Sequence, residues 1–278
     1  MTKMHRTAFL APLLLASVAL AQPLPAGLRF HAGFDGSTDA RQSGGDKRLY
    51  SAASYKEQSA AQPGLAAAPN VSLAAGQGRH NSGALRFATK NDRAVFYQAK
   101  GNVNFNPKNW TGTIAFFLKL DPETDLAPGY CDPIQVTDKA YNDSAIWTDF
   151  TKDDKPRHFR LSVFGALKVW NPNNIEPDKN PAFNNRLVVM KKTPFARDRW
   201  TSIVVAHSGL GGGAGRATLY VDGAAVGEAT GIAETFEWDP AKGAIRLGVA
   251  YVGLMDDVMI FDRVLTPAEI ARVAASRP

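Results

Sequence analysis

Residues 253–270, near the C-terminus, constrain the fold more than any other part of the chain. Apolar side chains alternate between both faces over 255–261, as in a β-strand buried on two sides. A helix is predicted to follow at once, because Thr266 can cap its N-terminus and Pro267 suits the first helical position. Glu269 stands three residues after the cap and can complete a capping box. The segment therefore predicts a strand that passes directly into a short helix.

Many further short segments alternate in the same way and are separated by Gly, Pro and Asn. The strongest, 113–120, is apolar on both faces and is predicted to lie centrally in a sheet. We expect 37–70, 122–143 and 171–185 to be surface loops. The other predicted strands are 28–34, 71–73, 84–87, 94–97, 145–150, 158–164, 166–170, 187–190, 200–207, 217–221, 225–228 and 245–249. This pattern predicts an all-β chain in which two antiparallel sheets form a sandwich, with a short C-terminal helix.

Residues 1–21 have the pattern of a secretory signal peptide. Lys3 and Arg6 provide the positive end, and 8–20 is the apolar stretch that precedes a small-residue cleavage site. We therefore expect a secreted or periplasmic protein whose single domain is 22–278. The apolar stretch is short for a bilayer, and no later one is long enough, which predicts no transmembrane segment after signal removal. The alternative is an N-terminal membrane anchor that is never cleaved.

Charge and cysteine content narrow the classes of partner. The formal charge of +6 falls to +4 once Lys3 and Arg6 leave with the signal peptide, and the basic residues are spread along the chain. This mild excess argues against a nucleic-acid partner and leaves an anionic polysaccharide possible. Cys131 is the only cysteine, so an internal disulfide and a cysteine metal site are both excluded. Composition leaves the oligomeric state open.

The segment 253–270 resembles the closing signature of laminin-G-like jelly rolls, which belong to the concanavalin A-like lectin/glucanase class. Further segments resemble the same class in the same order along the chain: 34–36, 83–87, 110–118, 199–205 and 219–223. The resemblance implies a two-sheet antiparallel jelly roll. It leaves function open, because this class contains lectin modules, hydrolases, lyases and adhesion domains. It does not extend to 37–70 or 122–185.

The same resemblance implies a structural calcium ion. In this class the first and last strands often lie together, with the ion between them, so Asp35 and Asp256 are the implied ligands and Asp257 a third candidate. Carboxylate oxygens suit calcium. The alternative is that Asp35 caps a turn and Asp256 accepts hydrogen bonds from the neighbouring backbone.

Two neighbouring strands are predicted to form a ligand groove. Strand alternation puts Trp147 and Asp149 on one face of the first strand, and His158 and Arg160 on one face of the second. A polar turn joins the strands, which predicts hairpin neighbours and places all four side chains on one side of a sheet, away from the core. An exposed Trp147 would stack on a sugar ring and Arg160 would bind hydroxyl or carboxylate groups. The alternatives are a solvated sheet face, or a Trp147 packed beneath the loop 171–185.

The sequence contains little that predicts catalysis. Glucanases of this class often carry Glu-x-Asp-x-x-Glu along one strand, and this chain does not. Asp149 is the only acid on a groove strand, with Asp143 as a possible loop partner, whereas a lyase could use Tyr141 or His158 as base beside Arg160. We therefore predict a secreted, non-catalytic recognition module that binds carbohydrate or a cell-surface partner. The alternatives are a polysaccharide-cleaving hydrolase or lyase of the same fold, and a structural or adhesive protein without a small ligand.

Overall fold

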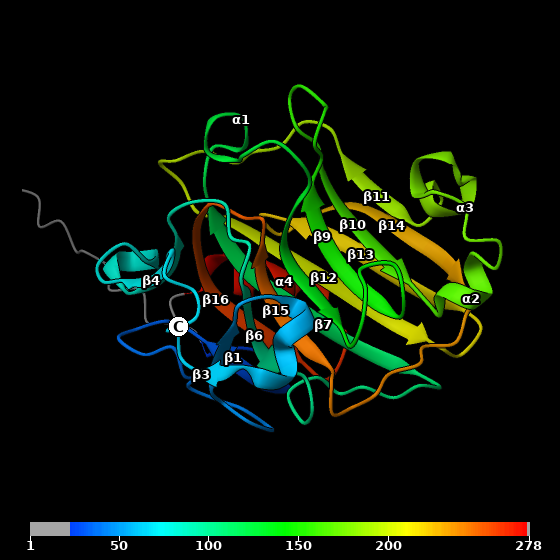
Figure 1. The fold of residues 1–278 in the computed structure, drawn as a ribbon, viewed down its shortest axis with the longest axis horizontal. Helices are drawn as coiled ribbons and strands as arrows, with labels where there is room; N and C mark the ends of the chain where they lie inside the picture. Colours follow the sequence, from blue (N-terminus) through cyan, green and yellow to red (C-terminus); the bar gives the residue numbers. More distant parts are fainter. Residues whose placement is uncertain (1–22, 277–278) are drawn as a thin grey trace, which may run out of the picture.

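Two antiparallel sheets stack face to face in the computed structural model, which describes residues 23–276 (Figure 1). Sheet A has the order β14 (Ala224–Ile232), β13 (Gly215–Val221), β12 (Thr201–Leu210), β7 (Trp110–Lys119), β16 (Gly253–Phe261), β5 (Ala84–Phe87) and β4 (Val71–Ala74), and β1 (Leu28–Ala32) also pairs with β16. Sheet B has the order β11 (Leu187–Met190), β10 (Phe159–Phe164), β9 (Ala145–Phe150), β8 (Cys131–Thr137), β15 (Ala244–Val249), β6 (Ala94–Gln98), β2 (Leu49–Ala52) and β3 (Gln62–Pro63). The predicted all-β, two-sheet antiparallel sandwich is confirmed. The predicted signal peptide, 1–21, lies outside the described residues.

The main core fills the space between the sheets and follows the two-residue period of the strands. In β7, Ile114 and Phe116 point into this core, where β9 contributes Ile146 and Phe150. The intervening Phe117 points to the opposite side of sheet A, into a second apolar cluster. As predicted, β7 is therefore central and buried on both faces.

The C-terminal helix α4 (Pro267–Ala275) covers the outside of sheet A. Its capping box is present, because the Thr266 hydroxyl accepts from the Glu269 N–H and the Glu269 carboxylate accepts from the Thr266 N–H at 2.9 Å. Ile270 and Val273 of the helix pack onto Phe117 and its neighbours in the second cluster. The apolar side chains of β16 thus pack into the main core on one face of the strand and against this helix on the other.

Several segments differ from the prediction, and weak local signals explain why. The expected loop 122–143 contains β8, whose outer positions are polar and whose Pro133 interrupts the strand pattern. The expected loop 37–70 contains the fully buried β2. The expected strand 166–170 is instead the short helix α2 (Leu167–Trp170), with its two large apolar side chains three residues apart. The last expected loop contains the short helix α3 (Pro181–Asn184).

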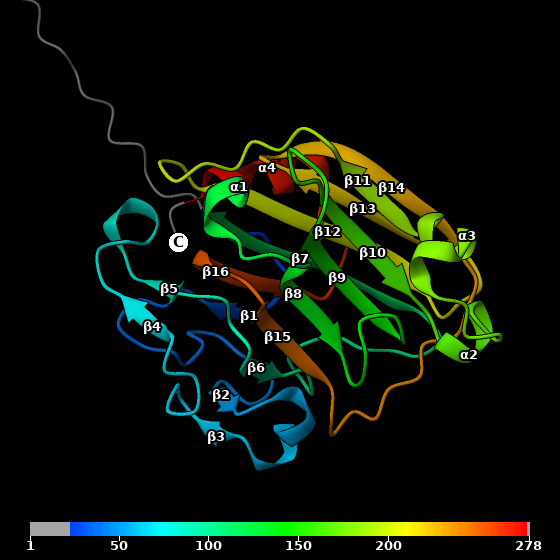
Figure 2. The same ribbon diagram turned by 45° about the horizontal axis from the view of Figure 1, so that its top comes forward.

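The outer face of sheet B, turned away from sheet A, is only partly covered. Figure 2 shows α2 and α3 beside the ends of β9 and β10, whereas the short 3-10 helix η1 (Tyr55–Ala60) lies at the edge formed by β2, β3 and β6. The middle of this face lies between these two covered regions. Within residues 23–276, no helix has the length and apolar character needed to cross a bilayer.

Candidate functional site

A pocket of about 300 Å³ opens on the outer face of sheet B, over β8, β9 and β10. We call it the aromatic pocket; its lining residues are Tyr130, Asp132, Tyr141, Trp147, Asp149, Arg160, Glu176, Pro177 and Phe183. Its volume lies at the lower end of the range of about 300–1,000 Å³ that small-molecule sites occupy. β9 and β10 are antiparallel neighbours, as predicted, and Arg160 lies directly opposite Asp149. Strand alternation thus brings three of the four predicted residues, Trp147, Asp149 and Arg160, to one pocket.

Trp147 is buried, and the expectation of an exposed tryptophan is wrong. Only 2% of its surface is accessible, because Phe164 and Phe183 lie against its ring with centroid distances of 6.2 and 6.4 Å. Phe183 belongs to α3, so the alternative of packing beneath 171–185 is the one observed. Trp147 nevertheless lines the pocket, and its buried Nε1 has no hydrogen-bond partner. An unsatisfied buried donor is rare in folded proteins and calls for an explanation.

Arg160 and Asp149 form a buried, two-pronged ion pair. The Arg160 Nε donates to Asp149 Oδ1 at 2.8 Å, and its Nη2 donates to Oδ2. Burial raises the pKa of Asp149, whereas the hydrogen bonds and positive charge of Arg160 act to lower it. The guanidinium carbon also lies 5.1 Å from the centre of the Tyr130 ring. The pair holds the arginine in a fixed orientation at the pocket.

Asp132 is a second carboxylate in the pocket that sequence reasoning missed. It lies in β8 beside an irregularity in the pairing with β9, between Cys131 and Ile134, and Gln135 Nε2 donates to its Oδ2 at 2.5 Å. Burial and then the charge of Asp149 raise the pKa of Asp132, which favours its protonated form. Two polar residues three positions apart, Asp132 and Gln135, were the sequence signal for this site. The adjoining Pro133 made the segment look like a loop.

Two tyrosines at the rim were also missed as recognition residues. Tyr130 and Tyr141 are 39% and 38% exposed, and both line the pocket. The Tyr141 ring meets Trp147 edge to face, with centroids 6.2 Å apart. The accessible aromatic surface at this site therefore belongs to the tyrosines, while Trp147 supports one of them from below.

The structure does not bring His158 into the aromatic pocket. This residue precedes β10, and its Nδ1 lies 3.4 Å from Asp154 Oδ2 in the polar turn. Its backbone N–H donates to the Thr151 hydroxyl at 3.0 Å. His158 therefore lies at the turn end of the hairpin, while Asp149 and Arg160 line the pocket.

The two predicted calcium ligands contact one loop. Asp35 Oδ1 accepts from the Gly83 N–H at 2.9 Å, and Asp256 Oδ2 accepts from the Arg79 N–H at 2.8 Å. The other Asp256 oxygen accepts from the Asp257 N–H at 2.8 Å. Burial and the neighbouring charge of Asp257 raise the pKa of Asp256. Asp256 thus accepts from the neighbouring backbone, as its alternative interpretation expects, whereas the bond of Asp35 runs to Gly83, 48 residues further along the chain.

Asp257 is already paired with a positively charged side chain of the protein. Its Oδ2 accepts from Arg79 Nη1 at 2.9 Å, and its Oδ1 lies 2.8 Å from His31 Nε2. Among the side chains that the structure describes, which are those of 23–276 without Asp178, no three His, Cys, Asp or Glu gather as a metal site. The donor set around Asp35 and Asp256 therefore does not form a calcium cage by itself, and calcium binding there stays a prediction.

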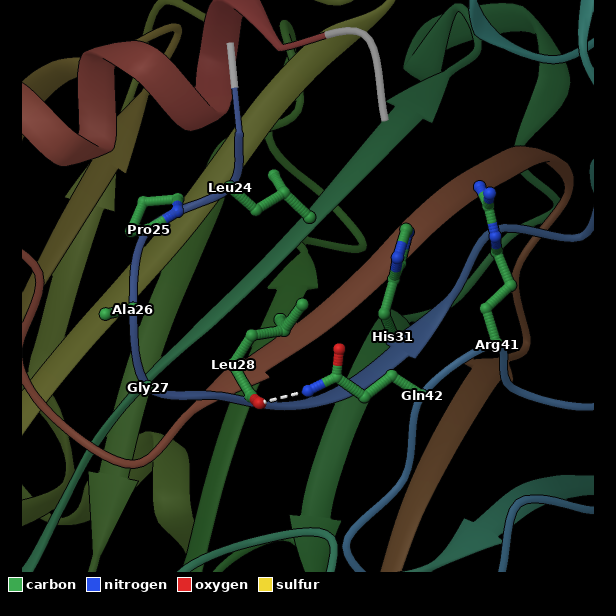
Figure 3. Close-up of a pocket in the computed structure, with 8 residues that line it drawn as sticks. All are labelled: Leu24, Pro25, Ala26, Gly27, Leu28, His31, Arg41 and Gln42. Carbon is green, nitrogen blue, oxygen red and sulfur yellow. Dashed lines mark hydrogen bonds between the residues drawn. The ribbon is translucent and has the colours of Figure 1, made fainter.

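A larger hollow, of about 540 Å³, lies at the start of the described chain (Figure 3). Its lining combines apolar residues with the polar side chains of His31, Arg41 and Gln42, and the Gln42 amide donates to the Leu28 carbonyl. His31 lines it, but the Nε2 of this ring faces Asp257. Among the described residues, no Phe, Tyr or Trp lines this hollow, whereas Tyr130, Tyr141 and Trp147 line the aromatic pocket, which is why we place the candidate site in the latter.

Residues 113–271 match the family described as the concanavalin A-like lectin/glucanases superfamily. No curated protein sequence matches the chain.

Solved structures share its fold at low sequence identity. Domain 4 of an extracellular arabinanase from Geobacillus stearothermophilus, solved with arabinotriose, has a TM-score of 0.53 and 15% identity over 89% of this chain and 98% of that one. The receptor-binding domain of botulinum neurotoxin D has a TM-score of 0.55 and 11% identity, over 90% and 52%. A sialidase from Trypanosoma rangeli has a TM-score of 0.52 and 12% identity, over 92% and 35%. The chain therefore spans about half of the toxin domain and about a third of the sialidase.

Proposed function

Because the chain belongs to the concanavalin A-like lectin/glucanase superfamily, we propose that it is a secreted recognition protein that binds carbohydrate in the aromatic pocket without cleaving it. The partner is a glycan or another sugar-bearing polymer at a cell surface. The signal-like pattern of residues 1–21 supports export. The solved relatives support the ligand class, since one was determined with arabinotriose.

The observation that carries this proposal is a pocket rimmed by two exposed tyrosines, with the ion-paired Arg160 in its lining. A sugar offers two complementary surfaces: the apolar face of the ring, which stacks on an aromatic side chain, and hydroxyl groups, which accept and donate hydrogen bonds. Tyr130 and Tyr141 present the aromatic faces. Arg160, which lines the pocket and is held by Asp149, is a hydrogen-bond donor for sugar hydroxyls.

One observation favours a second candidate, cleavage of a glycosidic bond. Asp132 and Asp149 line the same pocket, and burial with the charge of Asp149 favours the protonated form of Asp132. A protonated acid beside an ionised one is the arrangement that glycoside hydrolysis requires. Against it, both oxygens of Asp149 bond to Arg160, and Asp132 accepts from Gln135. These bonds occupy the carboxylate that would have to act on water or sugar, so we favour binding.

Binding to a glycan array, followed by product analysis on each hit, tests the proposal. Tyr141→Ala is expected to lower affinity about fivefold, because it removes a stacking surface worth about 1 kcal/mol. Tyr141→Phe keeps that surface and is expected to bind nearly as wild type. Val264→Ala is the matched control, since Val264 is likewise exposed but lies outside the pocket.

The outcomes separate the candidate functions. Glycan binding without products, weakened by Tyr141→Ala alone, supports the proposal. Products that disappear in Asp132→Asn would replace it with the hydrolase. An array without any hit would overturn both and leave a structural or adhesive role.

A further inference from the structure

A second pocket, of about 480 Å³, lies on the same outer face of sheet B, and a buried arginine forms part of its wall. We call it the Arg246 pocket; its lining residues are Tyr50, Tyr55, Lys56, Gln58, Ser59, Ala61, Phe96, Gln98, Asp138, Lys139, Ala241, Lys242, Gly243 and Arg246. Four of these residues are cationic and one is anionic. The pocket therefore has an excess of positive charge.

Arg246 has no carboxylate partner although it is buried. It is only 7% exposed, its Nε has no hydrogen-bond partner, and its Nη1 makes a long contact of 3.4 Å with Gln135 Oε1. Its guanidinium carbon lies 4.6 Å from the centre of the Tyr55 ring. Among the described residues, none of the ion pairs includes Arg246, whereas Arg160 on the same face is paired with Asp149.

The absence of a counter-charge for the buried Arg246 costs folding free energy. A buried charge without a counter-charge or full hydrogen bonding destabilises the folded state. Asp138 lines the same pocket and its charge acts on Arg246, but it forms no ion pair with Arg246 among those found within residues 23–276. Its Oδ2 accepts from the Asp239 N–H at 2.8 Å, and its buried Oδ1 has no hydrogen-bond partner among the described residues. Arg246 thus lacks a direct counter-ion in this pocket, and a negative group from outside the chain would supply one.

The two pockets are joined by one row of side chains. Trp147 lies directly opposite Gln135 across β9 and β8, and Gln135 lies directly opposite Arg246 across β8 and β15. Residues paired in this way point to the same face, and two strand spacings amount to about 10 Å. Gln135 also touches both sites, because its Nε2 donates to Asp132 and its Oε1 accepts from Arg246. One extended ligand can therefore reach from the aromatic pocket to Arg246.

We propose that the Arg246 pocket binds a carboxylate or sulfate group carried by an acidic glycan, and that this contact makes the protein select acidic over neutral chains. This inference rests on the proposed function, since the aromatic pocket holds the neighbouring sugar. The planar guanidinium suits either oxyanion by paired hydrogen bonds. Lys56 adds positive charge that draws the same group to the pocket, whereas Lys139 and Lys242 are paired with Asp143 and Asp239 at 3.5 and 3.4 Å.

The variant for the test is Arg246→Met, which removes the charge and keeps much of the side-chain volume. Because it replaces an unpaired buried charge by an apolar group, we expect the variant to fold and to be at least as stable as wild type. Lys242→Gln, at an exposed position of the same pocket, is the second variant. Lys108→Gln is the control, because Lys108 is exposed and lies outside both pockets.

Two measurements separate this inference from the function on which it rests. The first compares binding of a polyuronate, a sulfated glycan and a neutral glycan. We expect Arg246→Met to lose at least about tenfold in affinity for the acidic chains and to leave the neutral chain unchanged. Lys242→Gln should lose less, and Lys108→Gln nothing. The second measures the melting temperature with added sodium sulfate against sodium chloride of equal ionic strength. A larger rise with sulfate in wild type than in Arg246→Met is expected.

Each outcome has one meaning. Neutral and acidic chains bound equally well, with no specific sulfate effect, would overturn the Arg246 site and leave carbohydrate binding intact. A specific sulfate effect without any glycan binding would mean a site for free oxyanions, which overturns the acidic-glycan inference and the proposed function together. Loss of acidic-chain affinity in Lys108→Gln as large as in Arg246→Met would reduce the effect to general surface charge and would also overturn the site.

Discussion

His207 allows a quantitative prediction of how stability depends on pH. The residue lies in β12 and is 2% exposed, with neither ring nitrogen bonded to a partner. The Trp110 ring meets it edge to face, at a centroid distance of 4.9 Å. Burial lowers the pKa of His207 from its ordinary value of 6.5 to about 3. The folded protein therefore holds this histidine neutral over a range in which the unfolded chain takes up a proton.

The sign and size of the effect follow from proton linkage. The folded pKa lies below the unfolded one, so the contribution to stability is fully present above pH 6.5 and is lost as the pH falls toward 3. At pH 4.5 the loss from this one residue amounts to about 2 to 3 kcal/mol. Asp132 and Asp256, whose pKa values are raised, act in the opposite direction as the pH falls. The informative quantity is therefore the difference between wild type and a variant at His207.

The assay is urea unfolding of wild type and His207→Leu at several pH values between 7 and 4.5. Leucine is neutral and apolar throughout, so the variant should gain about 2 to 3 kcal/mol relative to wild type as the pH falls across this range. His158→Leu changes a histidine at the surface turn and serves as the control. Parallel pH profiles for wild type and His207→Leu would refute the reasoning, as would an NMR titration in which the His207 ring becomes charged above pH 5.

Two further predictions concern the candidate sites. Arg160→Met leaves the Asp149 carboxylate buried without its partner, so we expect the free energy of unfolding at pH 7 to fall by about 3 to 5 kcal/mol. The double variant with Asp149→Asn should recover part of this loss. A change below about 1 kcal/mol in urea unfolding would show that the pair is not buried in solution. If calcium binds at Asp35 and Asp256, adding calcium after chelation should raise the melting temperature of wild type and leave that of Asp256→Asn unchanged, and an unchanged wild-type melting temperature would contradict the calcium prediction.

The sequence by itself determined most of the strands, the C-terminal helix and the side of the sheet on which the site lies. Strand alternation is a local property with a period of two, so it placed Trp147, Asp149 and Arg160 on one face before any partner was known. The helix cap is also local, because Thr266 and Glu269 satisfy each other's backbone N–H groups within one turn. Such features depend only on neighbours along the chain, which is why sequence patterns predicted them.

Tertiary structure alone decided which of these side chains meet solvent and which meet each other. Trp147 is covered by Phe183, which belongs to α3, a short helix with no strong sequence signal. The contact between Gln135 and Arg246 joins positions 111 residues apart, and it exists because β8 and β15 happen to be neighbours in sheet B. A strand's alternation fixes the face on which a side chain lies but not the strand beside it. Packing of the whole core decides which distant strands pair. This pairing places the alternating side chains of β9, β8 and β15 side by side, and two adjoining pockets result.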